Sequence, residues 1–260
     1  MRLCDDSWMP ETFKKRRDPA PLGSIPDRLQ MFVREVRFYR EIGPAVGVRV
    51  PACFRAEERD GSTLLELEDL SSWRLGADPV AAAQMLVGLH EGWEGKALSE
   101  WPWLGQTDVS DLVERLFSET WASARNRSDL TSQVRNLGDD LVGQVRAVEE
   151  RAEASGPHTL VHGDASARNM RTSPAGEVAL LDWEDLGVGP GVCDLGWFLV
   201  SSVEPHSWDR TIAAYGNPSR LSEALPAVVV QGLLSLADEE EGSADARKWI
   251  ARLAEASRRI

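Results

Sequence analysis

The stretch LVHGDASARNMRTSPAGEVALLDWED, residues 160–185, contains two short apolar runs that each lead into acidic or amide side chains. The first run is followed by Asp164 and, five positions later, by Asn169. The second run leads directly into Asp182. We expect two short strands that bring these three side chains to one place. Carboxylate and amide oxygens suit a hard cation such as Mg²⁺, so the pattern indicates a metal site.

The spacing of these residues also suits phosphoryl transfer. That reaction needs a carboxylate to position the attacking hydroxyl, and ligands for the metal that bridges the nucleotide phosphates. Protein kinases place them on a His-x-Asp-x4-Asn loop, which is followed by a strand that ends in a second aspartate. Here Asp164 would orient the hydroxyl, and Asn169 and Asp182 would hold the metal. The alternative for Asp164 is an aspartate that only caps a turn or a helix.

The composition is that of a globular protein with an acidic surface. The 260 residues are 42% hydrophobic and 27% charged, which is enough for one large domain or two lobes with a sizeable core. The formal net charge of −13 argues against nucleic acid or an anionic membrane as a partner, because both favour basic surfaces. The charge is compatible with a cationic substrate, and equally with an acidic surface that only keeps the protein in solution.

No segment has the pattern of a targeting or membrane sequence. The first ten residues contain no apolar stretch long enough for a signal peptide, and no run approaches the roughly 18 apolar residues that span a bilayer. The three cysteines, Cys4, Cys53 and Cys193, show no metal-type pairing, and their odd number fits a reducing compartment. We therefore expect a cytoplasmic protein.

Residues 1–70 have the pattern of a small lobe of mixed structure. A strand is expected at residues 11–15, and residues 24–42 favour one helix that starts at Ser24. The apolar residues on one face of this helix are Leu29, Phe32, Val33, Val36 and Tyr39. Two strands then flank the turn Asp60-Gly61, which is a strong hairpin signal.

Residues 71–260 are expected to form a mainly helical lobe, joined to the first by a connector near residues 66–72. His90 has the spacing of a packing residue within this lobe. Residues 237–246 are acidic and are expected to be an exposed loop. Helical periodicity covers residues 78–93, 111–124, 128–153, 196–202, 210–216, 223–237 and 245–257, and short strands are expected at 159–161, 170–172 and 177–183.

Several segments, taken in order, resemble one known family. HGDASARN, LLDWED and GPGVCDLGWFL are similar to the catalytic segment of the aminoglycoside phosphotransferase and choline kinase-like family. REVRFYREI resembles the helix of that family's N-terminal lobe, LLELEDLSS resembles its hinge, and LVGLHEGWEG resembles the helix that follows. The similarity runs from about residue 13 to residue 215. Each segment alone is a weak signal, whereas their order and spacing together are strong.

The resemblance implies an α+β, bilobal, protein-kinase-like fold with a shortened N-terminal lobe. It implies that Asp164 is the catalytic aspartate, and that Asn169 and Asp182 are the metal ligands. His162 would support the catalytic loop, and Asp194 would anchor it from the next helix. The implied cofactors are ATP and Mg²⁺.

On the nucleotide side, the resemblance implies that Lys15 binds the phosphates and pairs with Glu35, while the hinge residues Glu68 and Leu70 meet the base. Two roles are open for Glu184: it could be a ligand of a second metal, or an acidic residue on the surface. For Arg168, a phosphate contact and a merely exposed position are both open.

The nucleotide-binding side departs from the family pattern. The first glycine of the sequence is Gly23, which follows the lysine strand, so the glycine-rich hairpin over the phosphates is absent. Lys15 fits the family lysine best, and Lys14 would face the opposite side of the strand. The alternative for both lysines is a flexible basic terminus. Three explanations follow: a kinase without a phosphate lid, a recorded start downstream of the true one, or a fold kept only for binding.

Two functions are therefore in competition. The first is a phosphotransferase that moves the γ-phosphate of ATP to a hydroxyl of a small molecule, with a cationic antibiotic-like or metabolite substrate suggested by the acidic composition. The second is a kinase-like binding module, or pseudokinase, whose shortened lobe is completed by a protein partner; a role in Ser/Thr modification of a peptide is a variant of it. The intact set of Asp164, Asn169 and Asp182 favours the first.

Overall fold

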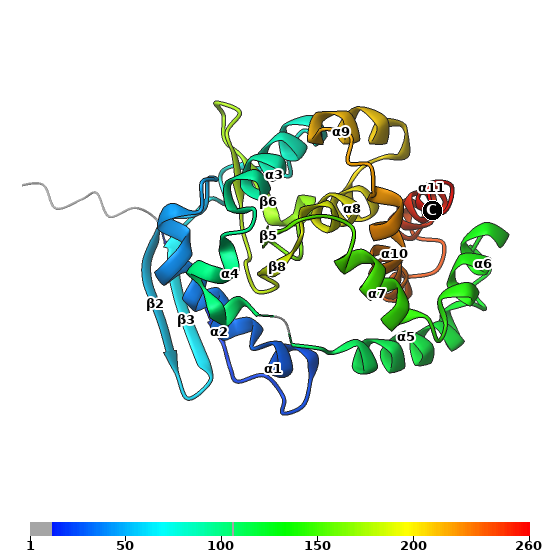
Figure 1. Ribbon diagram of the computed structural model, residues 1–260, viewed down its shortest axis with the longest axis horizontal. Helices are drawn as coiled ribbons and strands as arrows, with labels where there is room; N and C mark the ends of the chain where they lie inside the picture. The colour runs from blue at the N-terminus through cyan, green and yellow to red at the C-terminus, as the bar shows by residue number, and fades with distance from the viewer. Residues whose placement is uncertain (1–11, 106) are drawn as a thin grey trace, which may run out of the picture.

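The computed structural model describes residues 12–105 and 107–260, and it divides into a small sheet-containing part and a larger helical part (Figure 1). In the small part, strands β1 (Thr12–Arg17), β2 (Cys53–Arg59) and β3 (Ser62–Glu68) form an antiparallel sheet in the order β1-β3-β2. The strand and the hairpin expected from the sequence are confirmed. The boundary between lobes at residues 70 and 71 stays a prediction.

The helix expected at residues 24–42 is instead broken into three pieces. The Ser24 side chain accepts a hydrogen bond from the Asp27 amide as expected, but α1 (Ile25–Leu29) ends at Gln30, whose φ of 54° is left-handed. Helix α2 (Met31–Arg37) then continues into a π-helical turn, Phe38–Ile42. The break changes which residues face inward: the second half of the expected apolar face is buried, whereas Leu29, Phe32 and Val33 are only half-buried. The prediction of one continuous helix was wrong.

The larger part contains nine α-helices and two small sheets within the residues that the structure describes. Strands β4, β6 and β7 form one sheet in the order β4-β6-β7, and β5 pairs antiparallel with β8. The strand β8 was not expected from the sequence. The helices are α3 (Pro79–Trp93), α4 (Ala97–Glu100), α5 (Ser110–Ala124), α6 (Ser132–Leu141), α7 (Val145–Glu153), α8 (Gly191–Ser202), α9 (Trp208–Tyr215), α10 (Leu221–Ala237) and α11 (Ala244–Ser257), and the strands are β4 (Arg74–Leu75), β5 (His158–Val161), β6 (Met170–Thr172), β7 (Val178–Leu180) and β8 (Gly187–Pro190).

The single helical stretch expected at residues 128–153 is two helices, α6 and α7. Gly143, with a φ of +75°, stands at the break. The carboxylate of Glu114, on α5, accepts hydrogen bonds from the amides of Gly143 and Val145, both at 2.9 Å. This carboxylate therefore caps the start of α7 from a distant segment, which the local sequence does not reveal.

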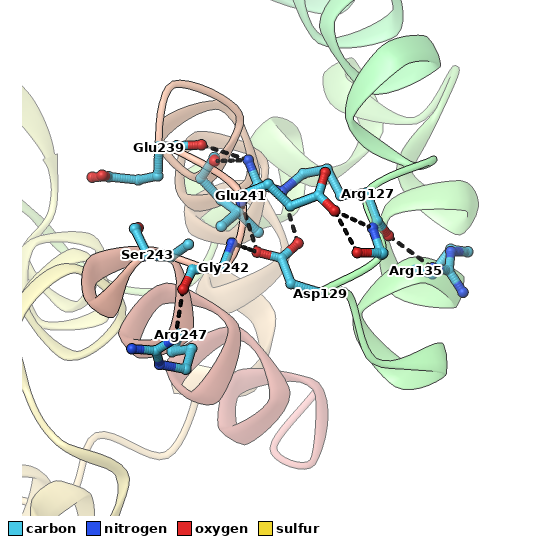
Figure 2. A network of polar contacts seen from close by, with 11 residues as sticks. Arg127, Asp129, Arg135, Glu239, Glu241, Gly242, Ser243 and Arg247 are labelled. Atoms are coloured by element: carbon cyan, nitrogen blue, oxygen red, sulfur yellow. Dashed lines mark hydrogen bonds and ion pairs between the residues drawn. The ribbon is translucent and has the colours of Figure 1, made fainter.

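The helices α5, α6, α10 and α11 are joined at one end by two loops (Figure 2). The guanidinium of Arg127 donates hydrogen bonds to the carbonyl oxygens of Leu236 and Glu239, at 3.2 and 2.6 Å. The Asp129 carboxylate, which pairs with Arg127, accepts a hydrogen bond from the Gly242 amide at 2.8 Å. The acidic loop expected after residue 237 is thus present and largely exposed, but it is tied to the loop between α5 and α6.

One hydrophobic core runs through both parts. Its largest fully buried side chains come from both: Phe38 lies in the small part, and Trp183, Phe117, Phe198 and Trp208 lie in the larger one. Phe38 and Trp183 stack with their ring centroids 4.0 Å apart. This contact joins the end of α2 to the segment that follows β7, where the predicted metal ligand Asp182 lies.

The edge strands of the small sheet carry two half-exposed aromatic side chains. Phe13 on β1 is 52% exposed and Phe54 on β2 is 50% exposed. Within the described residues, β1 pairs only with β3. That a partner protein covers this edge stays a prediction. No helix of the described residues combines the length and the apolar character needed to cross a bilayer.

Candidate active site

The loop after β5 is held in place by the buried carboxylate of Asp194, at the start of α8. Its two oxygens accept hydrogen bonds from the amides of His162 and Gly163, at 2.7 and 2.9 Å. His90 on α3 contacts the same carboxylate at 3.1 Å, and its other ring nitrogen lies 2.7 Å from the Tyr215 hydroxyl. His90 was expected only to pack in the core, and it is instead part of this hydrogen-bonded network.

The ring of His162 is fully buried and connects the catalytic loop to the strand segment before Asp182. Its Nε2 donates to the Leu181 carbonyl oxygen at 2.9 Å, and its Nδ1 accepts from the Asp164 amide at 3.2 Å. Burial lowers the pKa of His162, although the carboxylates of Asp194 and Asp164 oppose this shift. A neutral ring with the proton on Nε2 satisfies both contacts, which is the geometry of a structural support.

Gly163 is the residue that lets two segments approach each other. Its φ is +84°, and a Cβ at this position would lie 2.2 Å from the carbonyl oxygen of Asp185. Any other residue would therefore have both a strained backbone and a steric clash. The glycine between His162 and Asp164 is thus required by the close contact between the catalytic loop and residues 182–185.

The carboxylate of Asp164 is fixed by donors to both of its oxygens. Trp197 on α8 donates from Nε1 to Oδ1 at 2.5 Å, and Asn169 donates from Nδ2 to Oδ2 at 2.8 Å. The same amide nitrogen also donates to the Asp164 main-chain oxygen at 3.0 Å. These contacts fix how Asn169 is oriented, and its amide oxygen is the atom that could bind a metal.

Lys15 lies at the centre of a cluster of carboxylates. Its Nζ is 2.7 Å from Glu35, 2.5 Å from Asp182 and 2.6 Å from Glu184. Lys14, by contrast, faces the other side of β1 and pairs with Glu66 on the surface. The structure therefore separates the two candidate lysines: Lys15 points into the site, and neither lies in an irregular terminus.

Burial and charge act against each other in this cluster. Burial lowers the pKa of Lys15, but the nearby carboxylates of Glu35 and Asp182 outweigh burial and raise it overall. Burial raises the pKa of Glu35 to about 7, because the opposing effect of Lys15 is smaller. Lys15 is thus held as a cation, while Glu35 is an acid that titrates near neutral pH.

The carboxylates of this cluster offer the oxygen ligands that hard cations prefer. Oxygens of Glu35, Asp182 and Glu184 lie within 4.8 Å of one another, and the Lys15 ammonium contacts all three. Asp182 has a φ of 65°, which is uncommon for a residue with a side chain and often marks a functional position. Glu184 is buried and pairs with Lys15, so it is not a solvated surface acid.

A cavity of about 390 Å³ lies between the small sheet and the catalytic loop. The carboxylate of Glu68 is engaged by Arg49 at 2.5 Å, and Leu70 is buried, so a base at the hinge would meet main-chain atoms. Six of the residues expected at the site from the sequence line this cavity: Lys15, Glu35, Glu68, Leu70, Asn169 and Asp182. Phe13, Arg17, Tyr39 and Arg168 also line it.

A second cavity, of about 710 Å³, lies on the other side of residues 184–190. It is bounded by α1, α2, α7 and the start of α5. Six of its side chains are carboxylates and two are guanidinium groups: Asp108, Glu149, Glu150, Glu153, Glu184 and Asp185, with Arg34 and Arg146. Both guanidinium groups are engaged, since Arg34 donates to the carbonyl oxygens of Leu186 and Gly105, and Arg146 pairs with Asp108 and Asp111.

Some residues of the site were not found from the sequence. Trp197 binds the Asp164 carboxylate across 33 positions of the chain, and the His90–Asp194 contact spans 104 positions. Trp197 was part of the matched segment GPGVCDLGWFL, which was the one signal that could have singled it out from the ten tryptophans.

Similar solved structures share the whole architecture. An aminoglycoside phosphotransferase from Alicyclobacillus acidocaldarius is 19% identical, with 95% of this chain and 83% of that chain covered and a TM-score of 0.55. One from Streptomyces rimosus, solved with ADP and streptomycin, is 15% identical, with 86% of each chain covered and a TM-score of 0.58. A choline kinase from Streptococcus pneumoniae is 16% identical, with 95% and 85% covered and a TM-score of 0.53. No curated protein sequence matches the chain.

The fold and the site together define a kinase-like phosphotransferase, and the α+β, protein-kinase-like fold expected from the sequence is confirmed. Residues 16–226 match the model of the phosphotransferase enzyme family, which is most of the chain. The chain therefore belongs to that family. Its activity is accordingly that of a phosphotransferase.

Proposed function

We propose that this enzyme transfers the γ-phosphoryl group of Mg-ATP to a hydroxyl of a small cationic molecule. The observation that carries the proposal is the meeting of two cavities at residues 182–185. The cleft with Lys15 and Asp182 lies on one side, and the cavity rich in carboxylates lies on the other. Glu184 connects the two, because it lines the second cavity and pairs with Lys15, which lines the first.

In this proposal, the nucleotide occupies the cleft with its base at residues 68–71. Lys15, oriented by Glu35, binds the phosphates, and Asn169 and Asp182 provide oxygen ligands for Mg²⁺, which would neutralise charge on the phosphates. Residues 1–70 and 71–260 are then the two lobes that enclose the nucleotide. A cytoplasmic location, where ATP is available, suits this chemistry.

Asp164 positions the acceptor hydroxyl for attack. Trp197 and Asn169 hold its carboxylate in one orientation, so little reorganisation is needed when the acceptor arrives. The transition state of phosphoryl transfer is loose, and the hydroxyl therefore needs alignment more than early deprotonation. Exposed carboxylates of the second cavity, such as that of Glu150, would attract the ammonium groups of the acceptor.

A transfer assay with a panel of small molecules that carry both hydroxyl and ammonium groups tests the proposal. Each compound is compared with a neutral analogue that lacks the ammonium group. In a separate experiment, the binding of Mg-ATP to the enzyme is measured by calorimetry. We expect turnover with at least one cationic compound and weaker turnover with its neutral analogue. The Asp164→Asn variant should bind Mg-ATP but lose transfer by about 10²-fold or more.

Asp60→Asn, in the exposed hairpin turn, is the matched control and should keep full activity. Transfer that survives the Asp164→Asn change would contradict the role given to this residue. Turnover that prefers the neutral analogues throughout would contradict the cationic acceptor.

A further inference from the structure

The inner face of β1 presents three side chains to the nucleotide cleft. Phe13, Lys15 and Arg17 alternate with Lys14 and Arg16, and only the first three line the cavity. This follows from the two-residue period of a strand. A second cation, Arg17, therefore lines the cleft on the same face of β1 as Lys15. The family resemblance gives Arg17 no role.

The register of the sheet orders these side chains along the cleft. Thr12 lies opposite Glu68, where the chain enters the hinge, and Arg17 lies opposite Thr63, near the hairpin turn. With increasing distance from the hinge, the cleft is therefore lined first by Phe13, then by Lys15 and then by Arg17. Residues two apart on a strand are roughly 7 Å apart, so Arg17 stands about that much further from the hinge than Lys15. A nucleotide with its base at the hinge would extend its terminal phosphates toward Arg17.

Arg17 is already held next to the phosphate-binding lysine. Its Nη2 lies 2.5 Å from the same Glu184 oxygen that Lys15 contacts at 2.6 Å. The guanidinium also lies over the ring of Phe32, with 5.3 Å from its Cζ to the ring centroid. The side chain remains 42% exposed, so it can exchange one anionic partner for another without first being uncovered.

Arg17 has donor groups that suit phosphate oxygens. A guanidinium offers several N–H donors in a planar fork that matches such oxygens. We propose that Arg17 binds the terminal phosphates of ATP, an inference that rests on the nucleotide site of the proposed function.

Calorimetric titration of Mg-ATP, Mg-ADP and AMP into the wild-type chain and three variants tests this inference. Arg17→Gln should weaken ATP binding by about tenfold or more, and AMP binding by no more than about twofold. Arg17→Lys should recover part of the loss for ATP. Arg16→Gln makes the same change in charge on the opposite face of the strand, and its affinities should equal those of the wild type. Thermal unfolding without nucleotide confirms that each variant is folded.

Three results would overturn the inference. The first is wild-type affinity for ATP in Arg17→Gln. The second is an equal loss for ATP and AMP, which would mean that Arg17 only supports the cleft through Glu184. The third is a wild-type chain that binds none of the nucleotides, a result that would overturn the proposed function as well. The first two leave the proposed function intact.

Discussion

The carboxylate of Asp164 depends on a single indole for the orientation of one oxygen. Trp197 donates to Oδ1 at 2.5 Å, and it is the only contact to that atom recorded among the described residues. Trp197→Phe keeps the ring and removes the donor. Because a hydrogen bond to a charged group contributes about 1.5–3 kcal/mol, we expect kcat to fall by roughly tenfold or more. The KM for ATP should change little, since Trp197 does not line the cleft assigned to the nucleotide. Steady-state kinetics with an acceptor identified in the transfer assay measures both constants.

Trp249 offers the matched control. Its ring centroid lies 6.0 Å from that of Trp197, and no hydrogen bond joins it to Asp164 among the described residues. Trp249→Phe should therefore keep kcat within about twofold of the wild-type value. If the two substitutions lower kcat equally, packing of the aromatic pair matters rather than the hydrogen bond.

At the same scale, the sequence could predict residues that form a local pattern, and could not predict those that act across the fold. Asp164, Asn169 and Asp182 stand at fixed spacings, so the sequence singles them out. His90 and Trp197 have their partners far away in the chain, and a histidine or tryptophan on a helix is as readily explained by packing. The choice of Lys15 over Lys14 rested on the family resemblance, and in the structure Lys15 contacts Glu35 whereas Lys14 pairs with Glu66.

Between elements, the two loops that join α5 to α6 and α10 to α11 depend on Arg127 (Figure 2). Its guanidinium binds carbonyl oxygens at the end of α10, where the unpaired acceptors of a helix lie. Its side chain is only 10% exposed. Arg127→Ala should lower the free energy of unfolding by about 2–3 kcal/mol, because the carbonyls and Asp129 lose a charged partner. Urea denaturation measures this loss.

Arg125 provides the comparison within the same loop. It also pairs with an aspartate, Asp139, but both side chains are well exposed to solvent. An exposed pair contributes about 0–1 kcal/mol, so Arg125→Ala should be nearly neutral. Equal losses in the two variants would mean that the contacts of Arg127 to α10 do not hold the loops together.

The ends of helices and strands are also determined partly by neighbouring residues and partly by residues that are distant in the sequence. The cap at Ser24 is formed with a neighbouring residue, Asp27, and the sequence predicted this helix start. The break before α7 depends on Glu114, whose carboxylate comes from another helix. The strand β8 has little β propensity of its own, and it exists because it pairs with β5.

Across the whole molecule, the cluster around Lys15 joins β1, α2 and the segment after β7, so its protonation affects global stability. In the unfolded chain Glu35 would titrate near its ordinary value of 4.5, whereas burial raises its pKa to about 7 in the folded state. Between these values the folded state binds the proton more tightly than the unfolded state. The contribution of Glu35 to the free energy of unfolding must therefore fall as pH rises from about 4.5 to about 7, and it becomes constant above that.

The comparison of wild type with Glu35→Gln isolates this effect, because glutamine does not titrate. We expect the stability of the wild type relative to the variant to decline across that window, with a slope of no more than about 1.4 kcal/mol per pH unit. Chemical denaturation at a series of pH values from 4 to 8 gives the difference.

Glu41 provides a check, because the pH dependence of its contribution to stability should have the opposite sign to that of Glu35. Its hydrogen bond to Arg37 holds the pKa of Glu41 below the ordinary value, with a further contribution from Trp103. Relative to Glu41→Gln, the wild type should therefore lose stability as pH falls below about 4.5, not as it rises. If the Glu35 comparison shows no change between pH 4.5 and 7, then Lys15 stabilises the charged carboxylate more than burial penalises it. The Glu35 carboxylate would in that case be ionised over most of this pH range.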